Sequence, residues 1–327
     1  MTVRVDRADG GCYNLPMAQV TCLGILVADV VGKPIDGLPA RGSLAAIDRI
    51  ELHTGGCAAN TGAALAKLGV ATNIIGKVGR DGLGDYVLNA LARTGADVRG
   101  IVQDEHGTPT SATMVIVDSA GERSFITSPG ANATFSLEDI DWQIALSAPI
   151  LHIAGPFLMT RYMGEENAQV LSRAKAAGLI TTLDTVWDAS GRWMQVLSPC
   201  LPHLDYALPS LEEARLITGK EHPREIAEVL LDAGVSVVGV KLGEEGSYVR
   251  TQKGDEITVP ALKVPTIDSL GAGDAWAAGF LCGLVQGWDL EKTTRFANAT
   301  GACCVQALGA TTGIRSFEET CAIAFGG

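Results

Sequence analysis

The sequence lacks several patterns that would assign it to common functional classes. None of its eight cysteines is in a C-x-x-C pair and its five histidines lie far apart, which excludes zinc-ribbon and thioredoxin-like patterns. It has no run of Lys and Arg, and 37 acidic against 25 basic residues give a net charge of −12. Because an acidic surface repels phosphate backbones, nucleic acid is not expected as a partner.

Long hydrophobic runs are also missing. The longest apolar stretch, Ala275 to Val285, is about half the length needed to cross a bilayer, so no membrane partner is expected. The N-terminus has no charged start followed by an apolar core, which a signal peptide requires. We therefore expect a cytoplasmic protein in which residues 1–18 form a loose leader.

The sequence does contain strand-like and helix-like segments that alternate over residues 19–327. This alternation predicts an α/β fold with a doubly wound, mostly parallel sheet and helices on both faces. The 327 residues, 47% of them apolar, suffice for one large domain with an appendage. The expected strands are 20–30, 72–78, 150–154, 179–184, 203–208 and 235–242, and the expected helices are 58–68, 84–94, 161–177, 210–218, 224–233, 271–285 and 290–307.

Two stretches, 32–54 and 99–131, interrupt the alternation. Within the second, residues 110–117 alternate between polar and apolar, a turn follows, and 123–126 resume a strand, which predicts a β-hairpin. We expect both stretches to form a small β-lid, with an antiparallel extension of the main sheet as the alternative. Since an exposed sheet edge invites pairing, we also expect a homodimer joined through lid strands.

The most informative segment is the glycine-rich turn 268–274, which opens directly into an apolar helix. Small residues let the backbone approach a ligand closely, and the first N–H groups of a helix have no partners within it. With the helix dipole, these groups form an anion site suited to phosphate. Asp274 lies beside that site, where it could take a proton from an attacking hydroxyl; the alternative is that it only caps the helix.

Other nucleotide-binding patterns do not fit. The chain has neither the G-x-x-x-x-G-K-[ST] loop nor the H-R-D loop of protein kinases. A dinucleotide-binding fingerprint would need glycine at position 276, which is Trp, and belongs early in a βαβ unit.

A second glycine-rich element precedes a helix of small residues near the N-terminus. Gly55 and Gly56 let a substrate lie against the backbone, and the Asn60 amide offers donors and an acceptor to sugar hydroxyls. A turn asparagine that satisfies its own backbone is the alternative for Asn60.

Together, the two glycine-rich elements resemble the two signatures of the ribokinase-like (PfkB) carbohydrate kinase family. The first signature spans 55–79 and the second spans 268–280, with Ser269 where Thr is commoner. Their order and separation match, and the resemblance extends from about residue 20 to the C-terminus. It implies an enzyme that transfers the γ-phosphoryl group of ATP to a sugar hydroxyl with the help of Mg²⁺.

The resemblance assigns the chemistry to the second signature. It implies that Asp274 is the general base. It also implies that the backbone N–H groups of Gly271, Ala272, Gly273 and Asp274 form the anion hole for the charge that develops on the transferred phosphoryl group.

The acceptor side follows from the N-terminal half. Asp29 resembles the aspartate at the end of the family's first strand, which holds two sugar hydroxyls, and it is expected to act with Gly55, Gly56 and Asn60. Arg123 in the hairpin is expected to reach the substrate, with a solvated side chain as the alternative.

The ATP side follows from the C-terminal half. Lys241, Gly243 and Gly246 resemble the strand and turn beside the ATP phosphates and ribose, and Lys241 stands where Thr is frequent. Asn298 resembles a helix position near the adenine, with an ordinary amphipathic-helix asparagine as the alternative.

Two cation sites are implied as well. Glu213 keeps the glutamate of the family's N-x-x-E segment, which orders Mg²⁺ through water, although Ser210 replaces the asparagine and predicts a helix cap. Asp268 and the backbone near Gly309 correspond to the monovalent-cation (K⁺) site of some members. Gly313 stands where a side-chain hydroxyl sometimes contributes to that site.

Two alternatives remain. A nucleoside kinase shares both signatures, and an aromatic ring in the lid that stacks on a base would favour it; Phe125 and Phe135 are the candidates. A non-catalytic sugar or nucleotide sensor could keep the fold but would have no need of Asp274.

Overall fold

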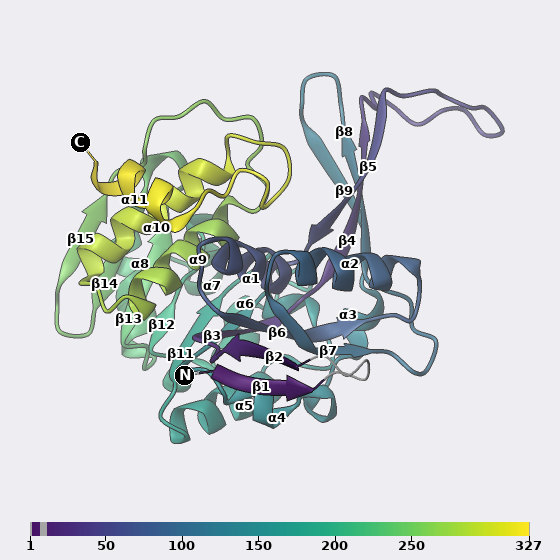
Figure 1. Ribbon diagram of the computed structural model, residues 1–327. Coiled ribbons are helices and arrows are strands. Elements are labelled where there is room, and N and C mark those ends of the chain that lie inside the picture. The colour runs from purple at the N-terminus through teal and green to yellow at the C-terminus, as the bar shows by residue number, and fades with distance from the viewer. Residues whose placement is uncertain (1, 7–11, 327) are drawn as a thin grey trace.

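The computed structural model describes residues 2–6 and 12–326, and its centre is a nine-stranded sheet (Figure 1). The strands are β3 (Val20–Gly24), β6 (Thr72–Val78), β7 (Asp97–Gln103), β10 (Ile150–Ala154), β11 (Ile180–Asp184), β12 (Tyr206–Ala207), β13 (Val237–Lys241), β14 (Ser247–Thr251) and β15 (Glu256–Val259). Their order is β15-β14-β13-β12-β11-β10-β3-β6-β7. β14 and β15 are antiparallel to their neighbours, whereas the other pairs are parallel. The predicted mostly parallel sheet is confirmed.

Helices cover both faces of this sheet. They are α1 (Cys57–Lys67), α2 (Gly82–Arg93), α3 (Gly130–Thr134), α4 (Trp142–Ala145), α5 (Glu165–Ala176), α6 (Trp193–Leu197), α7 (Leu211–Thr218), α8 (Pro223–Asp232), α9 (Ala272–Val285), α10 (Leu290–Cys304) and α11 (Phe317–Phe325). In Figure 1, α1 and α2 lie above β3 and β6, and α4 and α5 lie below. No helix in the described part of the chain is long and apolar enough to span a membrane.

Burial explains why these segments are strands. β6 and β10 are buried at every position, as expected for central parallel strands that are covered on both faces.

α9 is buried from Ala275 to Gly283 because it packs between α1 and α10. The glycine-rich turn before α9 is therefore anchored by a rigid, buried helix.

A separate four-stranded sheet projects from the body, and we call it the lid (Figure 1). Its strands are β4 (Val27–Lys33), β5 (Arg49–Gly55), β8 (Ala112–Val117) and β9 (Arg123–Ser128), in the order β5-β4-β8-β9. The antiparallel pair β8–β9 is the hairpin expected from the sequence. The connection between β4 and β5 extends beyond the strands in Figure 1.

The expected single strand 20–30 is wrong. The chain forms β3 in the main sheet, leaves it after Gly24, and continues as β4 in the lid. The break occurs because the Ile25 N–H bonds to the carbonyl of Ala154, while the N–H and C=O of Leu26 both bond to the side chain of Asn132.

The expected lid and leader boundaries also shift. Residues 99–103 belong to β7 of the main sheet, and residues 130–134 form α3, so the second lid segment is shorter than expected. Within the expected leader, β1 (Thr2–Asp6) and β2 (Cys12–Pro16) pair with each other, whereas residues 1 and 7–11 lie outside the described part.

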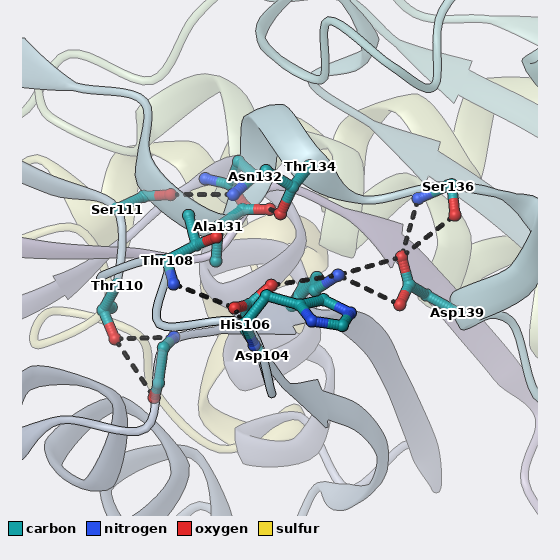
Figure 2. Close-up of polar contacts among 12 residues, drawn as sticks. Asp104, His106, Thr108, Thr110, Ser111, Ala131, Asn132, Thr134, Ser136 and Asp139 are labelled. Atoms are coloured by element: carbon teal, nitrogen blue, oxygen red, sulfur yellow. Dashed lines mark hydrogen bonds and ion pairs between the residues drawn. The ribbon is translucent and has the colours of Figure 1, made fainter.

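The lid strands enter and leave the body at a buried group that we call the lid root: Leu26, Ser111 and Asn132. The Asn132 amide donates to the Leu26 carbonyl at 2.9 Å and accepts from the Leu26 N–H at 3.1 Å. The Asn132 N–H donates to the Ser111 hydroxyl at 3.1 Å, a contact that Figure 2 shows. Leu26 precedes β4, Ser111 precedes β8 and Asn132 follows β9, so one asparagine ties together three lid connections.

Candidate active site

Three charged side chains meet at the carboxyl edge of the parallel sheet. β11 ends at Asp184, β13 ends at Lys241, and the first turn of α7 carries Glu213. The Lys241 ammonium donates to both carboxylate oxygens of Asp184, at 2.5 and 2.7 Å. Because parallel strands end at the same edge, residues far apart in the sequence come into contact there.

Burial and the neighbouring charges shift the pKa values of Asp184 and Lys241. Burial raises the pKa of Asp184 to about 7, and the Lys241 ammonium opposes that rise. Burial alone lowers the pKa of Lys241, but the carboxylates of Asp184 and Glu213 reverse this effect and raise it. Lys241 therefore stays cationic at neutral pH and keeps a positive charge at the edge of the sheet.

The glycine-rich loop starts α9 beside this ammonium. Gly271 has a left-handed backbone, with φ 75°, and a Cβ there would overlap Ala310, so glycine is required. A Cβ placed on Gly273 would lie 3.3 Å from Lys241 Nζ. The N–H groups at the start of α9 and the lysine therefore lie together, in an arrangement suited to a phosphate.

Asp274 lies in the first turn of α9 and faces α1. The Asn60 amide donates to Asp274 Oδ2 at 2.8 Å. Burial raises the pKa of Asp274, while the Asn60 bond, the Lys241 charge and the Cys57 thiol oppose the rise. Asn60 Oδ1 is buried without a hydrogen-bond partner among the described residues, so it can still accept one from a ligand.

Asp29 lies at the base of the lid, in β4. Its cross-strand neighbour in β5 is His53, and a Cβ on Gly55 would overlap the Asp29 carboxylate. Burial raises the pKa of Asp29 to about 6, and the nearby His53 and the Thr113 hydroxyl oppose the rise. The Asp29 carboxylate is thus held against a glycine that leaves room for it.

Two cavities open on either side of the loop 268–273. The lid cavity, about 550 Å³, is lined by residues of the lid and by Asp268 and Leu270. The second cavity, about 860 Å³, is lined by Ser269, Ala272 and Gly273, and we call it the nucleotide-side cavity. Its wall also contains all four residues predicted to bind ATP: Lys241, Gly243, Gly246 and Asn298.

Asn298 lies in the wall of the nucleotide-side cavity, and its amide is bonded to the protein at both ends. Its Oδ1 accepts from Ser247 Oγ and Trp276 Nε1, both at 2.8 Å. Its Nδ2 donates to the carbonyls of Val259 and Pro260, at 3.0 and 3.1 Å. Because these bonds use both ends of the amide, Asn298 holds the chain after β15 in place and is not free to read an adenine.

Glu213 has a structural role of its own. Its Oε2 accepts from the Thr185 hydroxyl at 2.7 Å and from the Ser210 N–H at 3.2 Å. With the Ser210 hydroxyl, it forms a capping box at the start of α7. The predicted helix cap is confirmed, and it leaves Glu213 beside the Lys241–Asp184 pair.

Arg123 and Asp268 meet at the tip of the lid. Arg123 begins β9, and its Nη1 lies 2.5 Å from Asp268 Oδ1. Both residues line the lid cavity. The cation that faces Asp268 in this structure is therefore a side chain of the lid.

Three residues that lie beside the predicted site residues had not been assigned to the site from the sequence: Asp184, His53 and Cys57. Asp184 stands at a strand end, which is a usable signal, but its pairing with Lys241 depends on strand order. His53 lies beside Asp29 just before the first signature, and Cys57 lies within that signature beside Asp274; neither residue type indicated a role.

The profile of the pfkB family carbohydrate kinases matches residues 17–316. The chain belongs to this family. An uncharacterized sugar kinase of Archaeoglobus fulgidus is 31% identical over 251 residues, which cover 76% of this chain and 97% of that protein. The 2-dehydro-3-deoxygluconokinase of Bacillus subtilis is 26% identical, with 85% of this chain and 88% of that protein covered.

Among solved structures, the ribokinase of Arabidopsis thaliana in complex with ribose and ATP superimposes with a TM-score of 0.82. It is 26% identical, and the match covers 95% of this chain and 99% of that one. The ribokinase-like fold predicted for this pfkB kinase is confirmed, and the family is one of phosphotransferases that act on a hydroxyl group.

Proposed function

We propose that this pfkB kinase phosphorylates a hydroxyl of a sugar with ATP, using Asp274 as the general base. The observation that carries the proposal is the position of the loop 268–274. It separates the two cavities and ends in a carboxylate whose Oδ2 is fixed at 2.8 Å from the Asn60 amide. The nucleotide-side cavity would take ATP. The acceptor would enter from the lid cavity and reach the buried group of Asp29, Asn60 and Asp274, none of which lines either cavity in this structure.

In this reaction Asp274 removes the proton of the acceptor hydroxyl while the hydroxyl oxygen attacks the γ-phosphorus of ATP. The new O–P bond forms while the bond between the γ-phosphorus and the bridging oxygen breaks, and ADP leaves with that oxygen. The N–H groups of Gly271, Gly273 and Asp274 and the Lys241 ammonium stabilise the charge on the transferred group. The Ala272 N–H, which was also expected to contribute, donates to the Ser269 carbonyl at 3.2 Å in this structure. Asp274 later releases its proton to solvent.

Mg²⁺ would be bound through water and the ATP phosphates. The described residues contain no cluster of three or more His, Cys, Asp or Glu that could enclose a metal ion. Glu213 and Asp184 are fixed by Thr185 and Lys241 and carry negative charge toward the phosphate position. This arrangement suits an ion that keeps most of its waters, whose charge would neutralise the phosphates.

For the acceptor, we propose a sugar in preference to a nucleoside. Asp29 and the free Oδ1 of Asn60 are acceptors that match hydroxyl groups. Phe135 is fully buried against Tyr162, and the described residues that line the lid cavity include no phenyl, phenol or indole ring. Phe125, the other candidate, is 54% exposed and is the cross-strand neighbour of Val115, which lines the lid cavity. It is therefore the ring that a nucleoside kinase would use for stacking, and the nucleosides in the screen below test it.

The deciding experiment is an ATP-consumption screen in the presence of Mg²⁺. It covers ketoses, hexoses, pentoses, 2-keto-3-deoxy acids and nucleosides, and compares the wild type with Asp274→Asn. We expect turnover of one sugar class and a loss of about 100-fold or more in the variant. Asp289→Asn, which changes an N-cap aspartate of α10, is the matched control and should stay active. Near-normal turnover by Asp274→Asn would rule out the assigned base, and ATP binding without turnover would favour a sensor.

We also propose that two copies pair through their lids. Leu52, Val30, Met114 and Ile126 are cross-strand neighbours on one face, and Met114 and Ile126 are 56% and 55% exposed. A second copy could cover this face with the same face of its own lid. In sedimentation experiments, Met114→Glu combined with Ile126→Glu should convert a dimer into a monomer. A wild type that sediments as a monomer at all concentrations would contradict the proposal.

A further inference from the structure

The tip of the lid carries a positive charge into the loop that precedes α9. Arg123 Nη1 lies 2.5 Å from Asp268 Oδ1, and the two side chains are 18% and 2% exposed. Within the described residues, this is the only ion pair that Asp268 makes within 4 Å. If the lid moved away, the carboxylate would lose this counter-charge and be left with only its backbone N–H partners.

Asp268 also organises the backbone around the proposed anion hole. Its Oδ1 accepts from the Leu270 N–H at 2.6 Å, and its Oδ2 accepts from the Gly309 N–H at 2.8 Å. Gly271, which follows at once, packs on Ala310. The orientation of one carboxylate therefore connects the turn before α9 to the loop near residue 310.

The residues around Asp268 do not fit a K⁺ ion, which the family resemblance implied for this position. A K⁺ ion needs several oxygen ligands, but a guanidinium contacts Asp268 Oδ1 directly and N–H groups bond to both oxygens. Position 313 offers no side-chain oxygen, and a Cβ there would overlap the carbonyl of Cys303. The packing thus leaves no room for the missing ligand.

We propose that Arg123 takes the place of the monovalent cation and couples the lid to the anion hole. With the lid down, the guanidinium neutralises Asp268 and fixes the loop that binds the transferred phosphoryl group. With the lid raised, Asp268 loses its counter-charge and the loop loses a restraint. The anion hole is then fully ordered only when the acceptor is covered, which limits transfer of the phosphoryl group to water. Arg123 is in this view a positioning residue, and the inference rests on the proposed function.

The test compares wild type, Arg123→Ala and Arg123→Lys in K⁺ and in tetramethylammonium chloride at equal ionic strength. We expect wild-type kcat to be the same in both salts. Arg123→Ala should lose at least about tenfold in kcat, and added guanidinium should restore much of it. K⁺ should not restore it, because the Leu270 and Gly309 N–H groups still bond to both Asp268 oxygens and position 313 still offers no oxygen ligand. Arg123→Lys should keep an intermediate activity without K⁺ because it retains the charge. Arg295→Gln, which breaks an exposed pair with Glu291 on α10, is the matched control.

Thermal unfolding gives a readout that does not require turnover. Guanidinium at low concentration should raise the Tm of Arg123→Ala above its value in the same concentration of tetramethylammonium, and it should leave the wild-type Tm unchanged. K⁺ should change neither Tm. If no acceptor is found, the proposed function fails while this comparison still decides the role of Arg123.

Four results would overturn the inference. They are a wild type that needs K⁺, an Arg123→Ala variant with normal kcat, a loss that added guanidinium does not restore, and a change in the acceptor KM alone. The last result would instead assign Arg123 to substrate binding.

Discussion

The lid is held at its two ends by different kinds of interaction. At the root, a buried neutral amide, that of Asn132, bonds to both backbone groups of Leu26. At the tip, one ion pair joins Arg123 to Asp268, and the other residues of β9 are exposed. A buried amide is insensitive to salt and pH, whereas a partly exposed ion pair weakens as ionic strength rises. The lid is therefore built to turn about a fixed root and to release at its tip.

Of the changes that test the comparison between root and tip, removal of the Asn132 amide at the root should have the largest effect. Asn132→Ala leaves the buried N–H and C=O of Leu26 without partners, so we expect the free energy of unfolding to fall by about 2–4 kcal/mol. Chemical denaturation measures this, with Asn89→Ala as the control because Asn89 makes one exposed bond on α2. Equal losses of stability in the two variants would show that the buried Asn132 amide contributes no more than an exposed one.

Ionic strength should affect the tip of the lid but not its root, and this effect should be smaller than that of Asn132→Ala. Raising the ionic strength should weaken the Arg123–Asp268 pair by at most about 0.5 kcal/mol, because side chains that are 18% and 2% exposed are screened less than surface charges. It should leave the bonds of Asn132 unchanged. Hydrogen exchange should therefore become faster at amides of β8 and β9 near the tip, whereas the Leu26 amide should stay protected. Parallel changes at both ends would mean that the lid opens as one unit.

The smallest effect should be a shift in the pKa of Asp274, the proposed base, which lies between the root and the tip of the lid. Burial raises the pKa of Asp274 and the Asn60 amide lowers it, so Asn60→Ala should raise that pKa further. A base must be deprotonated to act, and the acidic limb of the kcat profile should therefore move to higher pH. Asn89→Ala again serves as the control, and an acidic limb that stays in place would separate Asn60 from the ionisation of Asp274.

The elements with strong local signals could be predicted from the sequence. β10 is apolar except for His152, and such short apolar runs indicate buried parallel strands. β6 is also buried throughout, although Thr72, Asn73 and Lys77 interrupt its apolar residues. The two glycine-rich elements predicted close approach of backbone, and Gly271 does have a left-handed conformation. The break at Ile25 and Leu26 was missed because an apolar run does not reveal that the chain leaves one sheet for another.

The partners of individual side chains were less predictable. Asn298 stands where a ligand contact was expected, yet four groups of the protein occupy its amide. Arg123 was expected to reach a substrate or solvent, and in the structure it faces Asp268. Each of these contacts joins elements that have no sequence relation to one another.

The sequence by itself determined the fold class, the family and the residues that could do chemistry. Periodicity and glycine positions are local properties, and they fix backbone geometry segment by segment. Only the tertiary structure decided which groups meet, because those contacts depend on strand order and helix packing. Asn60 and Asp274 are 214 residues apart, and their bond exists only because α1 packs against α9.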